Sequence, residues 1–260
     1  MATFKDITLL ITHYNRSKSL ERLLTSFKTQ DIVFGGIVVS DDCSKPEHVA
    51  HIKTLHKDFD FKLISPAKNG GLGNNINKGQ DAVTTPYTLY VQEDFDPKPG
   101  FFEHLQDAYS YLETDKGLDI ARFYAYFKYP YVKPYGKGFS EMVFHINPLY
   151  FNHIKFYVYS DHPHLRRSNF LEKFGRYAEG LNVDVTEYKM ALSFLRNKGR
   201  GIFYDKFTEL FDQKNSSDEP STAVHRPNWR AGESPFVLAL RAIYVKYKLL
   251  KCTLDVTFKK

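Results

Sequence analysis

The first ninety residues alternate between strand-like and helix-like patterns, and this alternation constrains the fold more than any other feature of the chain. Four short apolar runs have the strand pattern, at residues 7–12, 37–40, 61–64 and 87–91. Helical spacing occurs between them, in a segment through Leu20, Leu23, Leu24 and Phe27 that Ser17 can cap, and over residues 46–56 and 73–83. Buried strands that alternate with helices predict an α/β fold, with a Rossmann-type, mostly parallel sheet and helices on both faces.

The pattern is less regular beyond residue 115. Strands are predicted over residues 120–129 and 142–146, a helix over 168–177, and a further helix with Thr186 as its cap. Residues 212–228 are polar and contain two prolines, which predicts a loop. The last segment, 234–250, has the apolar face and the basic side chains of an amphipathic helix.

Composition excludes several classes of protein. The two cysteines of this 260-residue chain are far apart, so neither a disulfide framework nor a structural zinc site is expected. The apolar run near the N-terminus is too short for a signal peptide or a membrane span, and we expect a cytoplasmic protein. The net charge of +6 suits anionic nucleotides or a phospholipid surface, whereas no motif supports a nucleic acid partner.

Polar clusters follow three of the predicted strands. They are residues 12–15, 41–42 and 93–96, and each lies where its strand ends. Ligands of open α/β sheets bind outside the carboxyl ends of the strands. The sequence therefore predicts one crevice that gathers all three clusters.

The cluster after the fourth strand is acidic, with carboxylates at Glu93, Asp94 and Asp96. Like charges this close repel, so a cation is expected nearby. Mg²⁺ commonly takes one or two carboxylates together with substrate phosphates, and Asp94 and Asp96 share a side if the backbone is extended. The alternative is a solvated acidic turn before Pro97 and Pro99.

Two further motifs can serve a nucleotide. Asp41 and Asp42 follow the second strand, where a carboxylate can accept an N–H of a base or cap the helix that starts near Pro46. The glycine-rich stretch 69–79 precedes a helix, and such glycines let the backbone approach an anion closely. It lacks the P-loop pattern, so a tight strand-to-helix turn is its other interpretation.

These motifs, in this order, resemble family 2 glycosyltransferases of GT-A fold. The resemblance rests on Ile-Thr-Leu-Leu-Ile-Thr-His-Tyr-Asn-Arg, Val-Val-Ser-Asp-Asp-Cys-Ser, Asn-Gly-Gly-Leu-Gly-Asn-Asn-Ile-Asn-Lys-Gly and Val-Gln-Glu-Asp-Phe-Asp-Pro. It implies a nucleotide-diphosphate sugar as donor, with a UDP-sugar as the first choice, and Mn²⁺ or Mg²⁺ as the metal cofactor. It also implies a saccharide or lipid-linked saccharide acceptor, as in the synthesis of bacterial-type cell-surface polysaccharides or glycoconjugates.

The resemblance also assigns residues to roles. The nucleotide side comprises Thr12, Tyr14, Asn15, Asp41, Asp42, Asn69, Asn75 and Glu93, and the metal ligands are Asp94 and Asp96. The catalytic base of an inverting member is an acidic residue near a helix start in the acceptor half, which matches Glu187, with Asp184 as the second choice. The alternative role of Glu187 is structural: a negative charge in the first turn of a helix interacts favourably with the helix dipole.

The resemblance implies three parts: residues 1–115 for the nucleotide-sugar, 116–211 for the acceptor and the base, and 212–260 as a loop and a basic helix. His162, His164, Arg166 and Arg167 are interpreted as a solvated loop, with contact to the acceptor or the diphosphate as the alternative. For His225 and Arg226, in the polar C-terminal loop, closure over the donor as a lid is one alternative. The C-terminal helix either binds an anionic membrane surface or packs on the main domain. Two other functions stay open, a nucleotidyltransferase and a non-catalytic sugar- or nucleotide-binding module.

Overall fold

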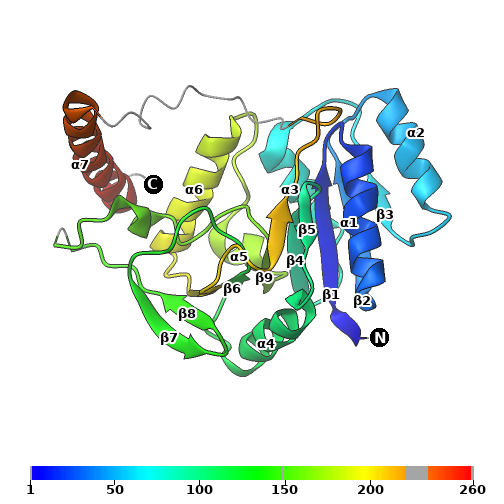
Figure 1. Ribbon diagram of the computed structural model, residues 1–260, viewed down its shortest axis with the longest axis horizontal. Helices are drawn as coiled ribbons and strands as arrows, with labels where there is room; N and C mark the ends of the chain where they lie inside the picture. The colour runs from blue at the N-terminus through cyan, green and yellow to red at the C-terminus, as the bar shows by residue number, and fades with distance from the viewer. Residues whose placement is uncertain (1, 148, 221–233, 259–260) are drawn as a thin grey trace.

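The computed structural model describes residues 2–147, 149–220 and 234–258, and its centre is a nine-stranded sheet (Figure 1). Four strands at one end are parallel, in the spatial order β3-β2-β1-β4. They are β1 (Ala2–His13), β2 (Ile32–Asp41), β3 (Lys62–Ile64) and β4 (Tyr87–Gln92). These are the four predicted strands, so the parallel α/β sheet is confirmed.

The sheet continues into the second half of the chain. Next to β4 come β9 (His164–Arg167), β6 (Ile120–Arg122), β10 (Gly201–Tyr204), β8 (Phe139–Met142) and β7 (Val132–Gly136). Strand β9 is antiparallel to both of its neighbours and joins the two halves. A separate two-stranded ribbon pairs β5 (Phe95–Pro97) with β11 (Phe211–Gln213).

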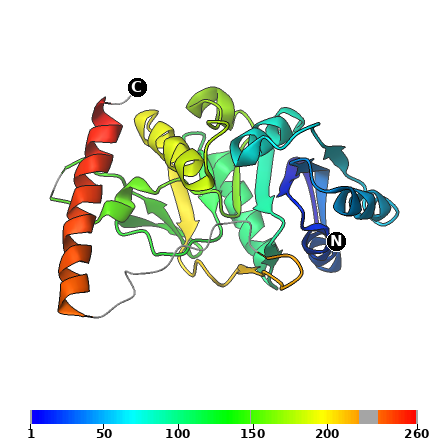
Figure 2. The ribbon, with the colours of Figure 1, turned by 90° about the horizontal axis from the view of Figure 1, so that it is seen from above.

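Helices cover both faces of the sheet, as Figure 2 shows for α3 and α6 on one side and α1 on the other. The helices are α1 (Ser17–Thr29), α2 (Pro46–Leu55), α3 (Gly71–Asp81), α4 (Phe101–Thr114), α5 (Phe170–Phe174), α6 (Val183–Arg196) and α7 (Pro235–Phe258), with a 3₁₀ turn η1 (His153–Phe156). Alternate residues of β1 enter opposite cores. Leu9 and Ile11 pack with α1, α2 and α4, whereas Leu10 packs with α3, α5 and α6. This is why the strand has three consecutive apolar residues, Leu9, Leu10 and Ile11.

Two predicted helix caps are wrong. Ser17 lies inside α1, where its hydroxyl is hydrogen-bonded to the rings of His48 and His51. Thr186 lies in the first turn of α6 and its hydroxyl donates to the carbonyl of Ala178. The residue that caps α6 is Asn182, whose side-chain oxygen accepts the backbone amide of Val185.

Several predictions for the second half are also too long or wrong. The strand at 120–129 ends at Arg122, the strand at 142–146 is replaced by β8, which ends at Met142, and the helix at 168–177 is reduced to α5. Gly175 at φ +80° ends that helix. The helix α4 was not predicted, although Phe101, Leu105, Ala108 and Leu112 form its buried stripe.

The prediction of a solvated loop at residues 162–167 is wrong as well, because His164–Arg167 form β9. Arg166 is fully buried there, and its guanidinium donates to the Tyr177 hydroxyl (2.6 Å) and the Gln80 side chain (2.8 Å). Gln80 comes from a distant part of the chain, and Tyr177 follows Arg166 by eleven residues, after α5. They satisfy a charge that the local sequence alone assigns to solvent.

Candidate active site

A cavity of about 400 Å³ opens at the carboxyl ends of the parallel strands. Its wall comprises Thr12, His13, Tyr14, Arg16, Asp42, Asn69, Gly71, Leu72, Asn75, Gln92, Glu93, Asp94, Tyr126, Asp161, His162, Val183, Asp184, Glu187 and Gln213. The three predicted polar clusters each contribute to it. The start of α6 forms the opposite wall, so residues from both halves of the chain face each other.

Asp42 organises the glycine turn beside the cavity. Its two carboxylate oxygens accept the amides of Gly70 (2.8 Å) and Gly71 (2.9 Å), and its carbonyl accepts the side chain of Asn69 (3.1 Å). Gly71 has φ +77°, a conformation that side chains disfavour. The glycines therefore serve a tight turn that Asp42 holds in place at the start of α3.

Two of the predicted nucleotide-side residues lie outside the cavity wall. Asp41 is fully buried and bonded to His13 (2.8 Å), Ser44 and Ser65 (2.8 Å). Although burial opposes ionisation, the hydrogen bonds from these side chains lower the pKa of Asp41 below its usual range. Asn15 accepts the amide of Lys45 (2.8 Å). Asp41 and Asn15 thus hold the two strand-end loops together.

The acidic cluster faces a buried arginine. Arg16 lies 3.2 Å from the Asp94 carboxylate and 3.7 Å from that of Glu93. Burial raises the pKa of Glu93 to about 7. The sequence predicted a compensating cation for this cluster, and among the described residues Arg16 supplies part of that charge. It was not predicted as a site residue, although it stands beside Tyr14 in the first motif.

Asp96 does not point into the cavity with Asp94. Its carboxylate pairs with Arg22 (2.8 Å) and Lys214 (3.0 Å) beside α1. The chain turns at Glu93 and Asp94 before β5 begins, so the extended spacing that would align Asp94 with Asp96 is absent. The carboxylates that share the cavity wall are those of Glu93 and Asp94.

Two carboxylate oxygens of this cluster are buried without a hydrogen-bond partner, Oδ1 of Asp94 and Oδ1 of Asp96, and of the two residues Asp94 lines the cavity. The other oxygen of Asp94, Oδ2, accepts Gln213 (2.9 Å). Hard divalent cations choose carboxylate oxygens, and Mg²⁺ takes few of them when phosphates complete its shell. No group of three metal-binding side chains occurs in the described part of the chain. The residues present therefore fit a metal that arrives with a diphosphate.

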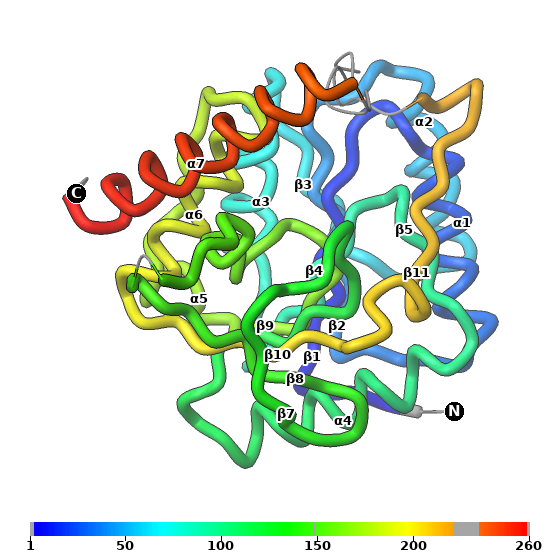
Figure 3. Tube along the Cα trace, turned by 60° about the vertical axis from the view of Figure 1, so that its left-hand side comes forward, coloured from blue at the N-terminus to red at the C-terminus, as the bar shows by residue number. Residues whose placement is uncertain are grey.

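The segment after β11 runs back along α1 (Figure 3). Its backbone amide at Lys214 donates to the carbonyl of Asp94 (2.7 Å). Further on, Glu219 accepts the amides of Lys18 (2.9 Å) and Ser19 (2.8 Å) in the first turn of α1. A carboxylate two hundred residues away thus performs the capping that Ser17 was predicted to perform.

Replacing Glu219 with Ala is expected to lower the free energy of unfolding by about 1–2 kcal/mol, the usual cost of losing a helix cap. Urea unfolding followed by circular dichroism measures it. The neighbouring variant Asp218→Ala is the control, since its pair with Lys18 is exposed on both sides and contributes less than about 0.5 kcal/mol. Equal stability of the two variants would contradict the capping role of Glu219.

The opposite wall carries a second acidic group. Glu187 lies one turn into α6, and its Oε1 accepts the backbone amide of Asp161 (3.1 Å). Burial is the main cause that raises the pKa of both carboxyls, and for Asp161 the neighbouring Glu187 adds to it. Asp184 also lines the cavity but is exposed at the first turn. Both predicted base candidates thus reach the cavity from α6, in the second half of the chain.

Asp161 was not predicted, and it ends a buried polar chain. Its Oδ1 accepts the Tyr159 hydroxyl (2.8 Å), which is bonded in turn to Tyr177 and through it to Arg166. Its Oδ2 is buried without a hydrogen-bond partner. The sequence around Asp161 has no periodic signal, and its neighbour His162 was assigned to a loop. His225 and Arg226 of the predicted lid lie outside the described residues.

Comparisons with known proteins agree with this geometry. Residues 8–175 match the model of the family described as "Glycosyl transferase family 2". No curated protein sequence matches the chain.

Solved structures share the fold at low identity. S. aureus TarS, residues 1–349, in complex with UDP-GlcNAc has a TM-score of 0.62 at 16% identity, over 96% of this chain and 72% of that one. The mannosyltransferase PcManGT from Pyrobaculum calidifontis, in complex with GDP-Man and Mn²⁺, has a TM-score of 0.54 at 13% identity, over 96% and 73% of the two chains. Glucosyl-3-phosphoglycerate synthase from Mycobacterium tuberculosis has a TM-score of 0.52 at 13% identity, over 96% of this chain and 79% of that one. The match over residues 8–175 and the mostly parallel sheet with its strand-end cavity make the chain a glycosyltransferase of family 2 with the GT-A fold.

Proposed function

We propose that the protein transfers a sugar from a UDP-sugar to a hydroxyl of a saccharide or lipid-linked saccharide, with inversion at the anomeric carbon. One observation carries the proposal. The cavity wall brings together the predicted nucleotide residues Thr12, Tyr14 and Asp42 with the predicted base Glu187. A donor bound between them has its reacting end next to a carboxylate from the acceptor half.

The donor side consists of β1, β2 and the glycine turn. Tyr14 offers a ring to the base, and Thr12 is fixed by its hydrogen bond to the Tyr90 hydroxyl (3.0 Å). Asp42 uses both oxygens on the glycine turn, yet each can accept a second hydrogen bond, here from an N–H of the base. TarS with UDP-GlcNAc supports a uridine donor, whereas PcManGT was solved with GDP-Man.

Glu93 and Asp94 are the residues that we assign to a divalent metal, Mn²⁺ or Mg²⁺. The free Oδ1 of Asp94 and the acidic donor set support this assignment. The bound metal supplies positive charge that neutralises the leaving nucleoside diphosphate. Arg16, beside both carboxylates, is placed to add a second positive charge to the phosphates. Asp96 keeps a structural role in its pairs with Arg22 and Lys214.

Glu187 is the proposed general base. Its carboxylate takes the proton from the acceptor hydroxyl while that oxygen attacks the anomeric carbon and the bond to the nucleoside diphosphate breaks. The Asp161 amide and the Ser160 side chain orient the Glu187 carboxylate in the cavity wall. In this proposal residues 1–115 hold the donor and 116–211 the acceptor. The free thiols of Cys43 and Cys252 suit the reducing cytoplasm.

Thermal unfolding in the presence of UDP, GDP, CMP and dTDP, each with and without Mn²⁺, tests the donor assignment. UDP with Mn²⁺ is expected to raise Tm most, because it is the proposed product with its metal and binds only the folded protein. A ligand at 100 times its Kd adds about 2.7 kcal/mol to the free energy of unfolding. Slow hydrolysis of the matching sugar nucleotide without acceptor then separates an enzyme from a binding module. A larger shift with GDP would replace the uridine donor, and no shift with any nucleotide would contradict the proposal.

A further inference from the structure

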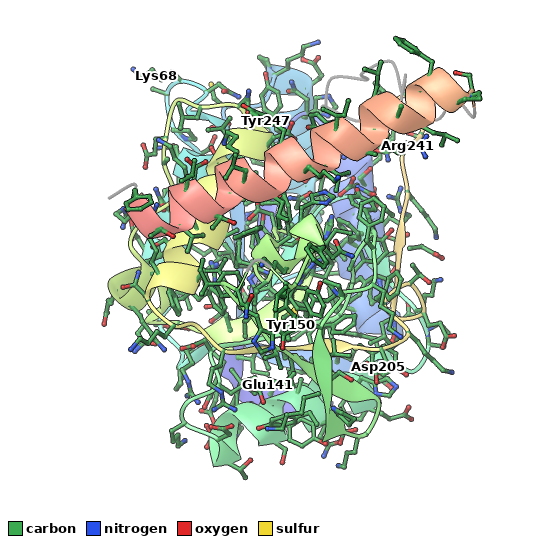
Figure 4. All side chains as sticks on the ribbon, turned by 90° about the vertical axis from the view of Figure 1, so that its left-hand side faces the viewer. Lys68, Glu141, Tyr150, Asp205, Arg241 and Tyr247 are labelled. Atoms are coloured by element: carbon green, nitrogen blue, oxygen red, sulfur yellow. The ribbon has the colours of Figure 1, made fainter. Side chains whose placement is uncertain are left out.

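The outward face of α7 is apolar along its whole length. Seven large apolar side chains on it are between 38% and 75% exposed: Phe236, Leu240, Ile243, Tyr247, Leu250, Leu254 and Phe258. They recur every three or four residues, so they form one continuous stripe on a 24-residue helix. Figure 4 shows α7 lying across the outside of the molecule, with Tyr247 labelled on it.

The opposite face of α7 packs Leu249, Cys252 and Val256 on the hydrophobic core of the second half of the chain, and polar contacts add to this attachment. Lys248 donates to the Tyr157 hydroxyl (3.0 Å) of the segment after η1, and the Tyr188 hydroxyl of α6 donates to Asp255 (2.9 Å). Cys252 and Asp255 are the buried residues of the helix. A surface helix normally turns its apolar stripe to the core. α7 does this with its inner face, and the exposed stripe is a second apolar face that packing on the main domain does not explain.

The loop before η1 exposes apolar side chains of its own. Ile146, Leu149 and Phe151 are 47%, 71% and 68% exposed, and they lead directly into the turn that α7 contacts. A continuous exposed apolar stripe such as that of α7 marks an interaction surface.

Charge distinguishes the two occupants that an apolar helix face can have, a second copy of the chain or a lipid surface. The basic residues of α7 are Arg241, Lys246, Lys248 and Lys251, and Asp255 is its one acidic residue. Helical geometry puts Lys246 and Lys251 on opposite flanks of the stripe. Paired helices use flanking charges of both signs. Flanks of one sign, in contrast, are typical of helices that lie in an anionic membrane interface.

We propose that α7 binds the surface of a bilayer rich in anionic lipid. The apolar stripe enters the region between headgroups and acyl chains, and Lys246 meets the lipid phosphates. On the other flank Lys251 pairs with the buried Asp255 (2.7 Å), and its ammonium has further donors for the phosphates. The helix then lies in the plane of the interface; among the described residues, no helix is long and apolar enough to span a bilayer. This attachment does not depend on the proposed donor or base. It places α6, whose start lines the cavity, next to the membrane.

Flotation with vesicles tests the proposal on the full chain. Binding is expected to vesicles of phosphatidylcholine with phosphatidylglycerol, to weaken in 0.5 M salt, and to be weak on phosphatidylcholine alone. The double variant Ile243→Ser with Leu250→Ser is expected to bind at least tenfold more weakly. Lys246→Gln is expected to lose about fivefold on the anionic vesicles only.

The matched control is Val33→Ser with Val132→Ser, which removes two exposed apolar side chains from β2 and β7. This control should bind vesicles like the wild type, and circular dichroism checks that both double variants are folded. Binding that survives the α7 substitutions, or no binding to anionic vesicles at all, overturns the proposal. A concentration-dependent dimer in sedimentation velocity, abolished by the α7 substitutions, would assign the stripe to a second copy instead.

Discussion

Replacing Glu187 with Gln is expected to lower kcat by about 10²- to 10⁴-fold and to leave the donor-induced rise in Tm unchanged. The range is the usual contribution of a general base. The amide keeps the size of the side chain and its hydrogen bond from the Asp161 backbone, but it cannot take a proton. Release of the nucleoside diphosphate, measured with an acceptor or as slow donor hydrolysis, gives kcat.

Asp184→Asn is the matched control for this substitution. Asp184 lines the same cavity from the same helix, three residues earlier, and is exposed to solvent. We expect its kcat to stay within about threefold of the wild type, because a solvated surface position contributes little. The opposite result, a large loss in Asp184→Asn and wild-type turnover in Glu187→Gln, would make Asp184 the base.

The pH profile provides an independent readout of Glu187. A base works only in its ionised form, and burial raises the pKa of Glu187 above the ordinary glutamate value of 4.5. The activity of the wild type should therefore fall, as the pH is lowered, at a pH above 4.5. Saturating donor and acceptor are used, so that kcat reports the enzyme–substrate complex. An activity that stays level down to pH 4.5 would contradict this assignment.

The sequence predicts the donor half well because its strands and helices are specified locally. In β1 every residue from Ile7 to Ile11 is buried, so the strand is recognisable without its partners. The stripe of α1 is equally local, and all four of its predicted apolar residues are buried. The strand-end rule then places Thr12, Asp42 and Asp94 at one edge without any knowledge of side-chain contacts.

The acceptor half depends on partners that the sequence does not reveal. β9 carries a buried Arg166, whose surroundings become polar only when Tyr177 and Gln80 fold against it. Asp161 likewise becomes a site residue only when its segment folds against Glu187 at the start of α6. Gln213 reaches Asp94 across 119 residues, through the ribbon of β5 and β11. No periodic pattern encodes such contacts, because each joins an isolated polar residue to a distant segment.

The second prediction with a large expected effect concerns Asp94, the proposed metal ligand. Asp94→Asn is expected to lower activity in saturating Mn²⁺ by about 10²- to 10³-fold, the cost of removing one electrostatic contact from a transition state. The variant should also lose the difference between the Tm with UDP alone and the Tm with UDP and Mn²⁺. The reason is that Oδ1 of Asp94 is buried in the donor-side wall of the cavity without a hydrogen-bond partner, beside the carboxylate of Glu93.

Asp96→Asn separates this role from general damage to the acidic cluster. The two aspartates are two residues apart and equally buried, but Asp96 faces Arg22 and Lys214 and Asp94 faces the cavity. Asp96→Asn should therefore lower Tm without changing the Mn²⁺ dependence of donor binding or turnover. If Asp94→Asn keeps full Mn²⁺-dependent transfer, the ion does not bind there. If Asp96→Asn loses the dependence instead, the cluster rearranges on binding the donor and the extended D-x-D spacing becomes the correct description of the site.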